Sequence, residues 1–309
     1  MAVIEERSHS TPAVIAAFLA NLGIAAMKFV GFGFTGSGAM LAEAVHSVAD
    51  TGNEGLLLLG GHRARREADL IHPFGYGRER YFWAFVVSVL LFTLGGAFSI
   101  LDGIEKLRNL HAIESVGWAV GVLAGAVVLE AISFRTAIRA SRAVKSPAIG
   151  WWRFIRTAKT PELPVVLLED LAALIGLSIA LVAVIVADMT GDARYDAIGS
   201  LAIGGLLVVV AFVLAVEMRS LLIGESASPS VQQRIIDAME GAAHVSRVIH
   251  LRTEHLGPEQ LLVAAKLEFT GDLSTRELAD VVNGVEVAVR SEVPEARVIY
   301  LEPDVLREP

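Results

Sequence analysis

Ionisable residues interrupt an apolar segment near residue 50 in a spacing that suits metal binding. His46 and Asp50 are four positions apart, and Asn53 follows three positions later. On an α-helix these spacings place the three side chains on one face. An imidazole and a carboxylate one turn apart are ligands that zinc and similar divalent cations take. The pattern therefore predicts half of a cation site, with a proton relay or polar contacts between helices as alternatives.

A second apolar segment carries two adjacent acids, Glu169 and Asp170, which can supply the other half of the site. Neighbouring helical residues point about 100° apart, so we expect only one of them to face the site squarely. Asn53, Glu169 or water would then be the fourth ligand. Such ligands bind a metal only when deprotonated, so metal binding would release protons. This coupling is what a proton–metal antiporter requires.

The composition predicts that these segments lie in a membrane. The chain has 309 residues, of which 54% are hydrophobic and 19% charged, and its formal net charge is −8. Soluble domains are rarely so apolar, and the negative charge argues against a nucleic-acid partner. Because the chain has no cysteine, disulfides, thiolate metal sites and cysteine nucleophiles are excluded.

Six apolar segments are long enough to span a bilayer, which needs about 20 residues. They cover approximately residues 12–34, 37–61, 82–101, 116–134, 163–187 and 197–216. The loops after the second and fourth segments hold 12 basic residues, against 3 in the other loops. The positive-inside rule then places both termini in the cytoplasm. We expect an integral protein of the cell's inner membrane, without a signal peptide.

Lys28 and Glu130 are further charges inside these segments, where an ionisable side chain is costly. We expect Lys28 to have a structural role, either by extending towards the interface or by pairing with a carboxylate. Glu130 lies five positions before Arg135, and we expect the two to form an ion pair.

From residue 224 onwards the sequence predicts a small α+β domain. Residues 228–241 form a helix with Ser228 as N-cap, followed by two alternating strands joined at Gly257. A capping box of Ser274 and Glu277 opens a second helix, and a final strand covers residues 296–301.

The predicted fold is thus a membrane all-α six-helix transmembrane bundle with a C-terminal ferredoxin-like αββαβ domain in the cytoplasm. We expect residues 1–223 to form the transport domain and residues 224–309 to form a cytoplasmic dimerisation domain.

Several of these segments resemble the cation diffusion facilitator family. The resemblance rests on His46-Ser-Val-Ala-Asp50, on residues 72–83 (His-Pro-Phe-Gly-Tyr-Gly-Arg-Glu-Arg-Tyr-Phe-Trp), and more weakly on residues 221–224 and 251–258. It implies efflux of a divalent cation, most readily zinc, in exchange for protons, by a homodimer whose C-terminal domains pack together. The resemblance implies neither an enzyme nor a cofactor.

The chain departs from the family pattern in the fifth span. Zinc-transporting members usually have His-x-x-x-Asp there, and Val166 stands in the histidine position while Asp170 matches the aspartate. The chain resembles the branch with a Glu-Asp pair, in which Glu169 would replace the imidazole. Harder oxygen ligands narrow the preference for zinc over manganese, iron or cobalt, and cadmium is a further possible substrate.

A second metal site of the family, Asp-x-x-His-x-x-x-His, is only partly present. Asp69 and His72 match its first two positions, and Tyr76 replaces the last histidine. Either a weak two-ligand site or packing of His72 at the membrane interface fits this pattern. In the tail, His250 and His255 have an odd spacing, so in a strand they would face opposite sides.

Two classes of function remain open at this stage. The leading hypothesis is secondary active export of a divalent metal, and the alternative is a membrane-bound metal sensor or scaffold without net transport. A zinc hydrolase is disfavoured because the chain has no His-Glu-x-x-His motif.

Overall fold

The computed structural model describes residues 10–35, 38–110 and 116–306, and the side chains of residues 38–46 are among those outside the description. By its contacts the chain divides into two compact units. One contains the chain up to Arg63 together with Glu79–Arg219, and the other contains Ala64–Arg78 together with Ser220–Pro309.

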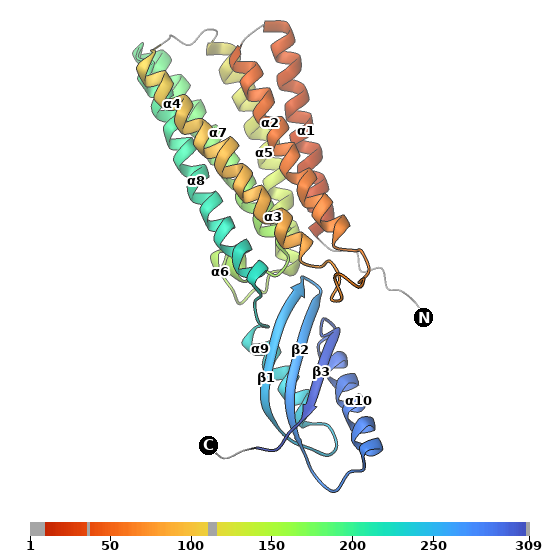
Figure 1. The fold of residues 1–309 in the computed structure, drawn as a ribbon. Coiled ribbons are helices and arrows are strands. Elements are labelled where there is room, and N and C mark those ends of the chain that lie inside the picture. The colour runs from red at the N-terminus through yellow and green to blue at the C-terminus, as the bar shows by residue number, and fades with distance from the viewer. Residues whose placement is uncertain (1–9, 36–37, 111–115, 307–309) are drawn as a thin grey trace. The chain divides into compact units, whose positions relative to one another are not determined.

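The first unit is a bundle of long helices (Figure 1). Its elements are α1 (Ser10–Thr35), α2 (Gly38–Arg63), α3 (Glu79–Leu90), η1 (Leu91–Ala97), α4 (Phe98–Arg108), α5 (Val116–Val144), α6 (Trp151–Thr157), α7 (Glu162–Thr190) and α8 (Arg194–Ile223). The π-helical segment η1 joins α3 and α4 into one continuous helix. The short helix α6 has no counterpart in the elements expected from the sequence.

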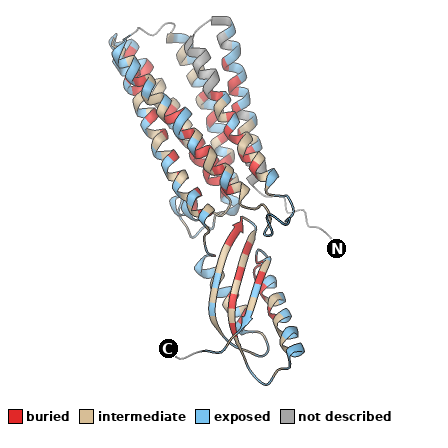
Figure 2. Ribbon diagram, viewed as in Figure 1, coloured by how far each residue is buried: buried red, intermediate tan, exposed pale blue. Residues whose placement is uncertain are grey.

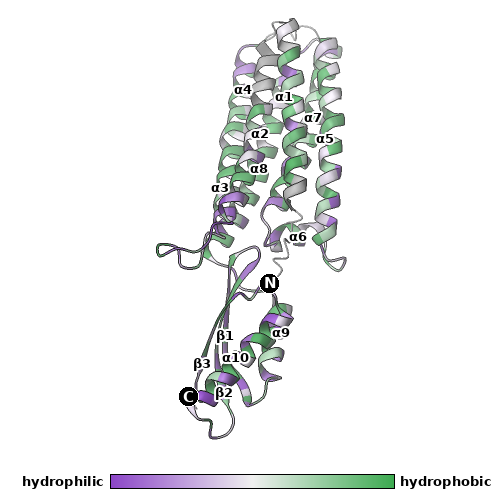
Figure 3. Ribbon diagram, turned by 90° about the vertical axis from the view of Figure 1, so that its right-hand side faces the viewer, coloured by the Kyte–Doolittle hydropathy of each residue, from purple (hydrophilic) through white to green (hydrophobic). Residues whose placement is uncertain are grey.

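Four helices in the described part of the chain are long and apolar enough to cross a membrane. They are Glu79–Arg108, α5, α7 and α8, and α1 adds a shorter apolar stretch, Val14–Val30. The second expected span is the helix α2, whose acidic and other polar residues make it less apolar. Apolar residues cover much of these helices in Figure 3, as a lipid-facing surface requires.

The centre of the bundle lies around α7. In this unit α1 packs along α2 and α5, and α5 packs along α7. Every residue from Glu162 to Asp170 is buried, so this stretch of α7 is enclosed on all its faces. Figure 2 shows the buried residues as bands along the helices that face one another.

Glycines allow η1–α4 and α8 to approach closely. A Cβ atom added to Gly204 would lie 2.8 Å from the backbone nitrogen of Ile100 and 2.9 Å from the carbonyl oxygen of Gly96. Small residues at such crossings let helix backbones pack tightly in membranes.

The second unit has the predicted αββαβ order. Its elements are α9 (Pro229–Glu240), β1 (Val245–Gly257), β2 (Gln260–Phe269), α10 (Thr275–Glu292) and β3 (Val298–Pro303). The sheet order is β1-β2-β3, with β1 antiparallel and β3 parallel to β2. Because parallel neighbours need a crossover connection, α10 carries the chain from β2 to β3.

Local signals at the ends of the elements are confirmed. Ser228 caps α9, with Pro229 in its first turn, by accepting a hydrogen bond from the backbone nitrogen of Val231. At α10, Ser274 and Glu277 form the expected capping box, in which the backbone nitrogen of Ser274 donates to Glu277 over 2.8 Å. These contacts satisfy backbone donors that have no partner inside the helix.

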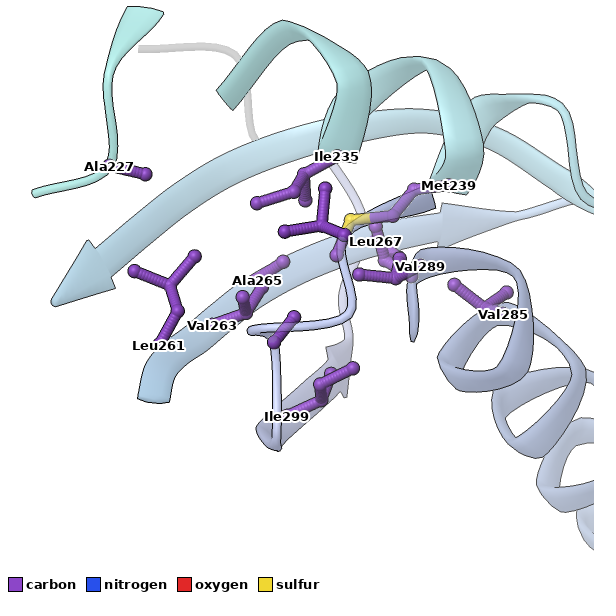
Figure 4. Packing of buried hydrophobic residues seen from close by; sticks show 12 residues of the cluster. Ala227, Ile235, Met239, Leu261, Val263, Ala265, Leu267, Val285, Val289 and Ile299 are labelled. Atoms are coloured by element: carbon purple, nitrogen blue, oxygen red, sulfur yellow. The ribbon is translucent and has the colours of Figure 1, made fainter. Parts of the chain in front are cut away.

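Side chains from α9, β2 and α10 form the core of this unit (Figure 4). Buried residues alternate along β2, at Leu261, Val263, Ala265 and Leu267, as expected for a strand with one covered face.

The loop Ala64–Arg78 packs against the end of the β1–β2 hairpin within the second unit. Arg78 forms an ion pair with Glu254. Gly77 lies against the hairpin turn, since a Cβ atom there would be 2.6 Å from the carbonyl oxygen of Leu256. The loop Ala64–Arg78 therefore contacts the β1–β2 hairpin of the C-terminal sheet through an ion pair and backbone packing.

Candidate metal-transport site

The α2 half of the site contains Asp50 and Asn53. Asn53 is 4% exposed, and its Nδ2 donates to Glu169 Oε1 over 2.8 Å. This hydrogen bond joins α2 to α7 directly. His46 also belongs to α2, but its side chain lies outside the described residues.

The α7 half contains both adjacent acids. Glu169 and Asp170 are 5% and 1% exposed. Glu169 accepts from Asn53 of α2, whereas Asp170 Oδ2 accepts from Ser133 Oγ of α5 over 2.8 Å. The two carboxylates thus have partners on different helices, as their angular separation requires.

These acids surround one cavity inside the bundle. It has a volume of about 100 Å³, and Asp50, Glu169 and Asp170 line it. A cavity needs about 10–15 Å³ of such space to hold one water molecule, so this one has room for an ion. Both acids of the pair line the cavity, and their hydrogen-bond partners lie on different helices, so which of them faces a bound ion squarely stays a prediction.

Two residues expected to be structural also line this cavity, Lys28 of α1 and Glu130 of α5. Glu130 is 6% exposed, and Lys28 is 5% exposed with its Nζ donating to Ser47 Oγ over 2.8 Å. One feature of the sequence could have indicated a functional role for both residues: ionisable side chains inside a membrane span are functional candidates by default. Sequence position alone did not show which way they face.

Several buried carboxylate oxygens in this part of the bundle accept no hydrogen bond from the described residues. Asn21 Nδ2 donates to Glu54 Oε1 over 2.7 Å, and Glu54 is fully buried. Within the described ranges, the second carboxylate oxygens of Glu54, Glu130 and Glu169 are buried and accept no hydrogen bond. Buried acceptors without partners are costly, and a cation or a proton would satisfy them.

The described side chains line the cavity without forming a closed coordination shell. Among them, no group of three or more histidine, aspartate or glutamate residues is placed to hold a metal ion. The side chain of His46 is not among the described residues. The described half of the site is therefore a set of oxygen donors around a cavity.

The loop residues Asp69 and His72 form a turn. Asp69 Oδ1 accepts from the backbone nitrogens of Ile71 and His72 over 2.9 and 2.7 Å, and Oδ2 accepts from the Tyr76 hydroxyl over 2.6 Å. The hydrogen bond from Tyr76, and next that from the His72 backbone, lower the pKa of Asp69 to about 2. His72 Nδ1 lies 3.5 Å from Asp69. With both oxygens already accepting, this geometry favours a structural role for Asp69.

The tail histidines do not share a face. His250 is exposed and accepts from Arg252 Nε over 2.8 Å, whereas His255 is buried. This difference agrees with their odd spacing along β1.

Comparison with known proteins identifies the family of the chain. A family model described as the cation efflux transmembrane domain matches residues 14–223. The mitochondrial proton-coupled zinc antiporter SLC30A9 of Mus musculus is 33% identical over 250 residues, which cover 81% of this chain and 44% of that protein. Metal tolerance protein C4 of Arabidopsis thaliana is 30% identical over 266 residues, covering 86% and 58% of the two chains.

The chain therefore spans about half the length of these curated relatives. The magnetosome protein MamB of Paramagnetospirillum magneticum is 26% identical over 288 residues, covering 92% of this chain and 90% of that protein. A solved structure titled MamM-CTD H264A covers 26% of this chain and all of its own, with 21% identity and a TM-score of 0.25.

The matched model describes a transport domain and not an enzyme, in agreement with the sequence analysis. That model matches residues 14–223, which is most of the chain. The chain belongs to the cation diffusion facilitator family.

Proposed function

We propose that this protein exports a divalent metal cation in exchange for protons. The ion would bind between α2 and α7, at Asp50, Glu169 and Asp170, with His46 and Asn53 completing the ligand set. The observation that carries this proposal is that the acids of α2 and α7 line one cavity in the bundle.

Zinc is the first candidate for the substrate. The nitrogen of His46 suits zinc, and relatives are named as a zinc antiporter and a metal tolerance protein. The described donors are oxygens, which also suit manganese and other harder ions. Manganese, iron and cobalt are therefore competitors to be compared with zinc, and the softer ion cadmium is compared alongside them.

Proton coupling follows from the chemistry of the donors. A carboxylate that holds a metal cannot hold a proton on the same electron pair, so the two ions compete for the cavity. Movement of the helices that alternately opens the cavity to each side would then exchange metal for protons.

The placement in the membrane is part of this proposal. We infer an integral membrane protein with both termini in the cytoplasm, acting as a homodimer through the second unit. The basic residues gathered in the loops after α2 and α5 support this orientation.

The experiment is zinc flux into vesicles that contain the full chain, driven by an imposed pH gradient. Asp50→Ala and Asp170→Ala should each abolish flux while the protein remains folded. Asp188→Asn is a matched control, because Asp188 is an exposed acid of the same helix α7. Zinc binding without flux in the unmodified protein would instead favour a sensor or scaffold, and normal flux in both alanine variants would contradict the assigned site.

A further inference from the structure

Lys28 places a positive charge inside the cavity where a positively charged substrate is expected. The side chain is 5% exposed, and its Nζ donates to Ser47 Oγ over 2.8 Å. Ser47 belongs to α2 and is itself 3% exposed. The ammonium is therefore held inside the bundle by a neighbouring helix, and it does not extend to the membrane surface.

The carboxylates around this lysine come from three helices. Asp50 of α2, Glu130 of α5, and Glu169 and Asp170 of α7 line the same cavity as Lys28. Acidic groups this close repel one another when ionised, and a cation among them relieves the repulsion. Among the described lining residues, Lys28 is the basic one.

A lysine ammonium and a divalent metal compete for the same negative potential. The metal gains less from the carboxylates while the ammonium stays among them, because like charges repel strongly at low dielectric. A transporter must release its ion as well as bind it, so very tight binding slows turnover. A fixed positive charge beside the site limits the affinity.

We propose that Lys28 is a tethered cation that balances the carboxylates of the empty cavity and weakens metal binding enough to allow release. This inference rests on the proposed function, since it assumes that the cavity holds the transported metal. Lys28 is thus a residue that sets affinity and turnover, and it is not a metal ligand. Ser47 positions the ammonium through its hydroxyl.

The test compares zinc affinity and zinc flux in the purified full chain. Lys28→Met removes the charge at similar length, and should tighten zinc binding at least about tenfold while lowering flux at saturating zinc. Lys28→Arg keeps the charge and should stay within about threefold of the unmodified affinity. Lys106→Met is a matched control, because Lys106 pairs with Asp102 and Asp196 and does not line the cavity.

Lys28→Gln is a second neutral variant, whose amide can still donate a hydrogen bond to Ser47. It can be measured in place of Lys28→Met if that variant does not fold. Unchanged or weaker zinc binding in a folded neutral variant would overturn the inference. So would failure of both neutral variants to fold while Lys28→Arg folds, because that result would assign Lys28 to folding alone.

The two proposals fail in different ways. If Asp50→Ala abolishes flux but the neutral Lys28 variants bind zinc normally, the inference about Lys28 is wrong and the proposed function stands. If the unmodified protein binds zinc without flux, the proposed function is wrong, whatever the Lys28 variants show.

Discussion

Asn53 and Glu169 join the two halves of the candidate site through one contact. The amide of Asn53 donates to a carboxylate that is 116 positions later in the chain. Both side chains are buried, so this hydrogen bond holds Glu169 in a defined orientation toward α2. A carboxylate oriented in advance binds a cation more tightly than one that must rotate into place.

Asn53→Ala should therefore raise the zinc concentration needed for half-maximal flux by about tenfold, the scale of one hydrogen bond to a charged group. The same flux assay measures it, with Asn109→Ala as a control outside the cavity lining. An unchanged half-saturation value in folded Asn53→Ala would show that the hydrogen bond does not contribute to metal binding.

The hydrogen bonds of the loop Ala64–Arg78 determine the pKa of the Asp69 carboxyl group. Its pKa is lowered from 3.8 to about 2, with the Tyr76 hydroxyl as the largest cause. Because the folded-state pKa is depressed, the turn is stabilised above about pH 4 and loses that stabilisation as the pH falls towards 2. At neutral pH the full stabilisation is present.

Tyr76→Phe should raise the pKa of Asp69 towards 3.8, since it removes the strongest hydrogen bond to the carboxylate. A carbon-detected NMR titration of labelled aspartate in the full chain measures this shift. Tyr300→Phe is the control, because Tyr300 is an exposed tyrosine of β3 in the second unit. A pKa that stays near 2 in Tyr76→Phe would show that the backbone nitrogens alone hold Asp69.

Among the elements, the loop between α2 and α3 packs closely against the β1–β2 hairpin. Gly77 and Gly257 meet backbone to backbone, and Arg78 pairs with Glu254 next to them. Both contacts lie within the second unit, which contains this loop and the C-terminal sheet.

Gly77→Ala should release the loop from the hairpin, because its Cβ atom would lie 2.6 Å from the carbonyl oxygen of Leu256. Overpacking of this kind costs about 1–3 kcal/mol. We expect faster trypsin cleavage in the loop Ala64–Arg78, whereas Gly150→Ala, which has open space around it, should leave the rate unchanged. Equal cleavage rates in the two variants would contradict the packing.

For the whole molecule, the second unit is a small domain with a core of its own. Leu267 is fully buried among side chains from α9 and α10, and Val287 of α10 is 62% exposed. Large-to-small changes in such cores cost about 2–5 kcal/mol, whereas exposed positions tolerate them.

Leu267→Ala should therefore lower the free energy of unfolding of this unit by about 2–5 kcal/mol. Val287→Ala should change that free energy by less than about 0.5 kcal/mol. If the proposed homodimer forms through this unit, Leu267→Ala should also reduce the dimer fraction in light scattering of the detergent-purified protein. An intact dimer with an unfolded second unit would place the dimer contact in the helical bundle.

The sequence by itself determined the long helices but not the short helix α6, and it determined the caps, the hairpin, the αββαβ order and the family. These features depend on residues close together in the chain, through helical spacing, strand alternation and capping pairs. Helical spacing selected Asp50 and Asn53, and their place inside an apolar segment selected Glu169 and Asp170. The structure brings these residues to one region of the bundle.

Only the tertiary structure decided which other side chains share the cavity. Glu130 was expected to pair with Arg135 and Lys28 to be structural, yet both line the cavity beside Asp170. Their direction depends on how each helix is rotated about its axis, and packing against distant helices fixes that rotation. The docking of the loop on the hairpin has the same cause, because it joins residues 176 positions apart. Local sequence patterns do not encode contacts at that separation.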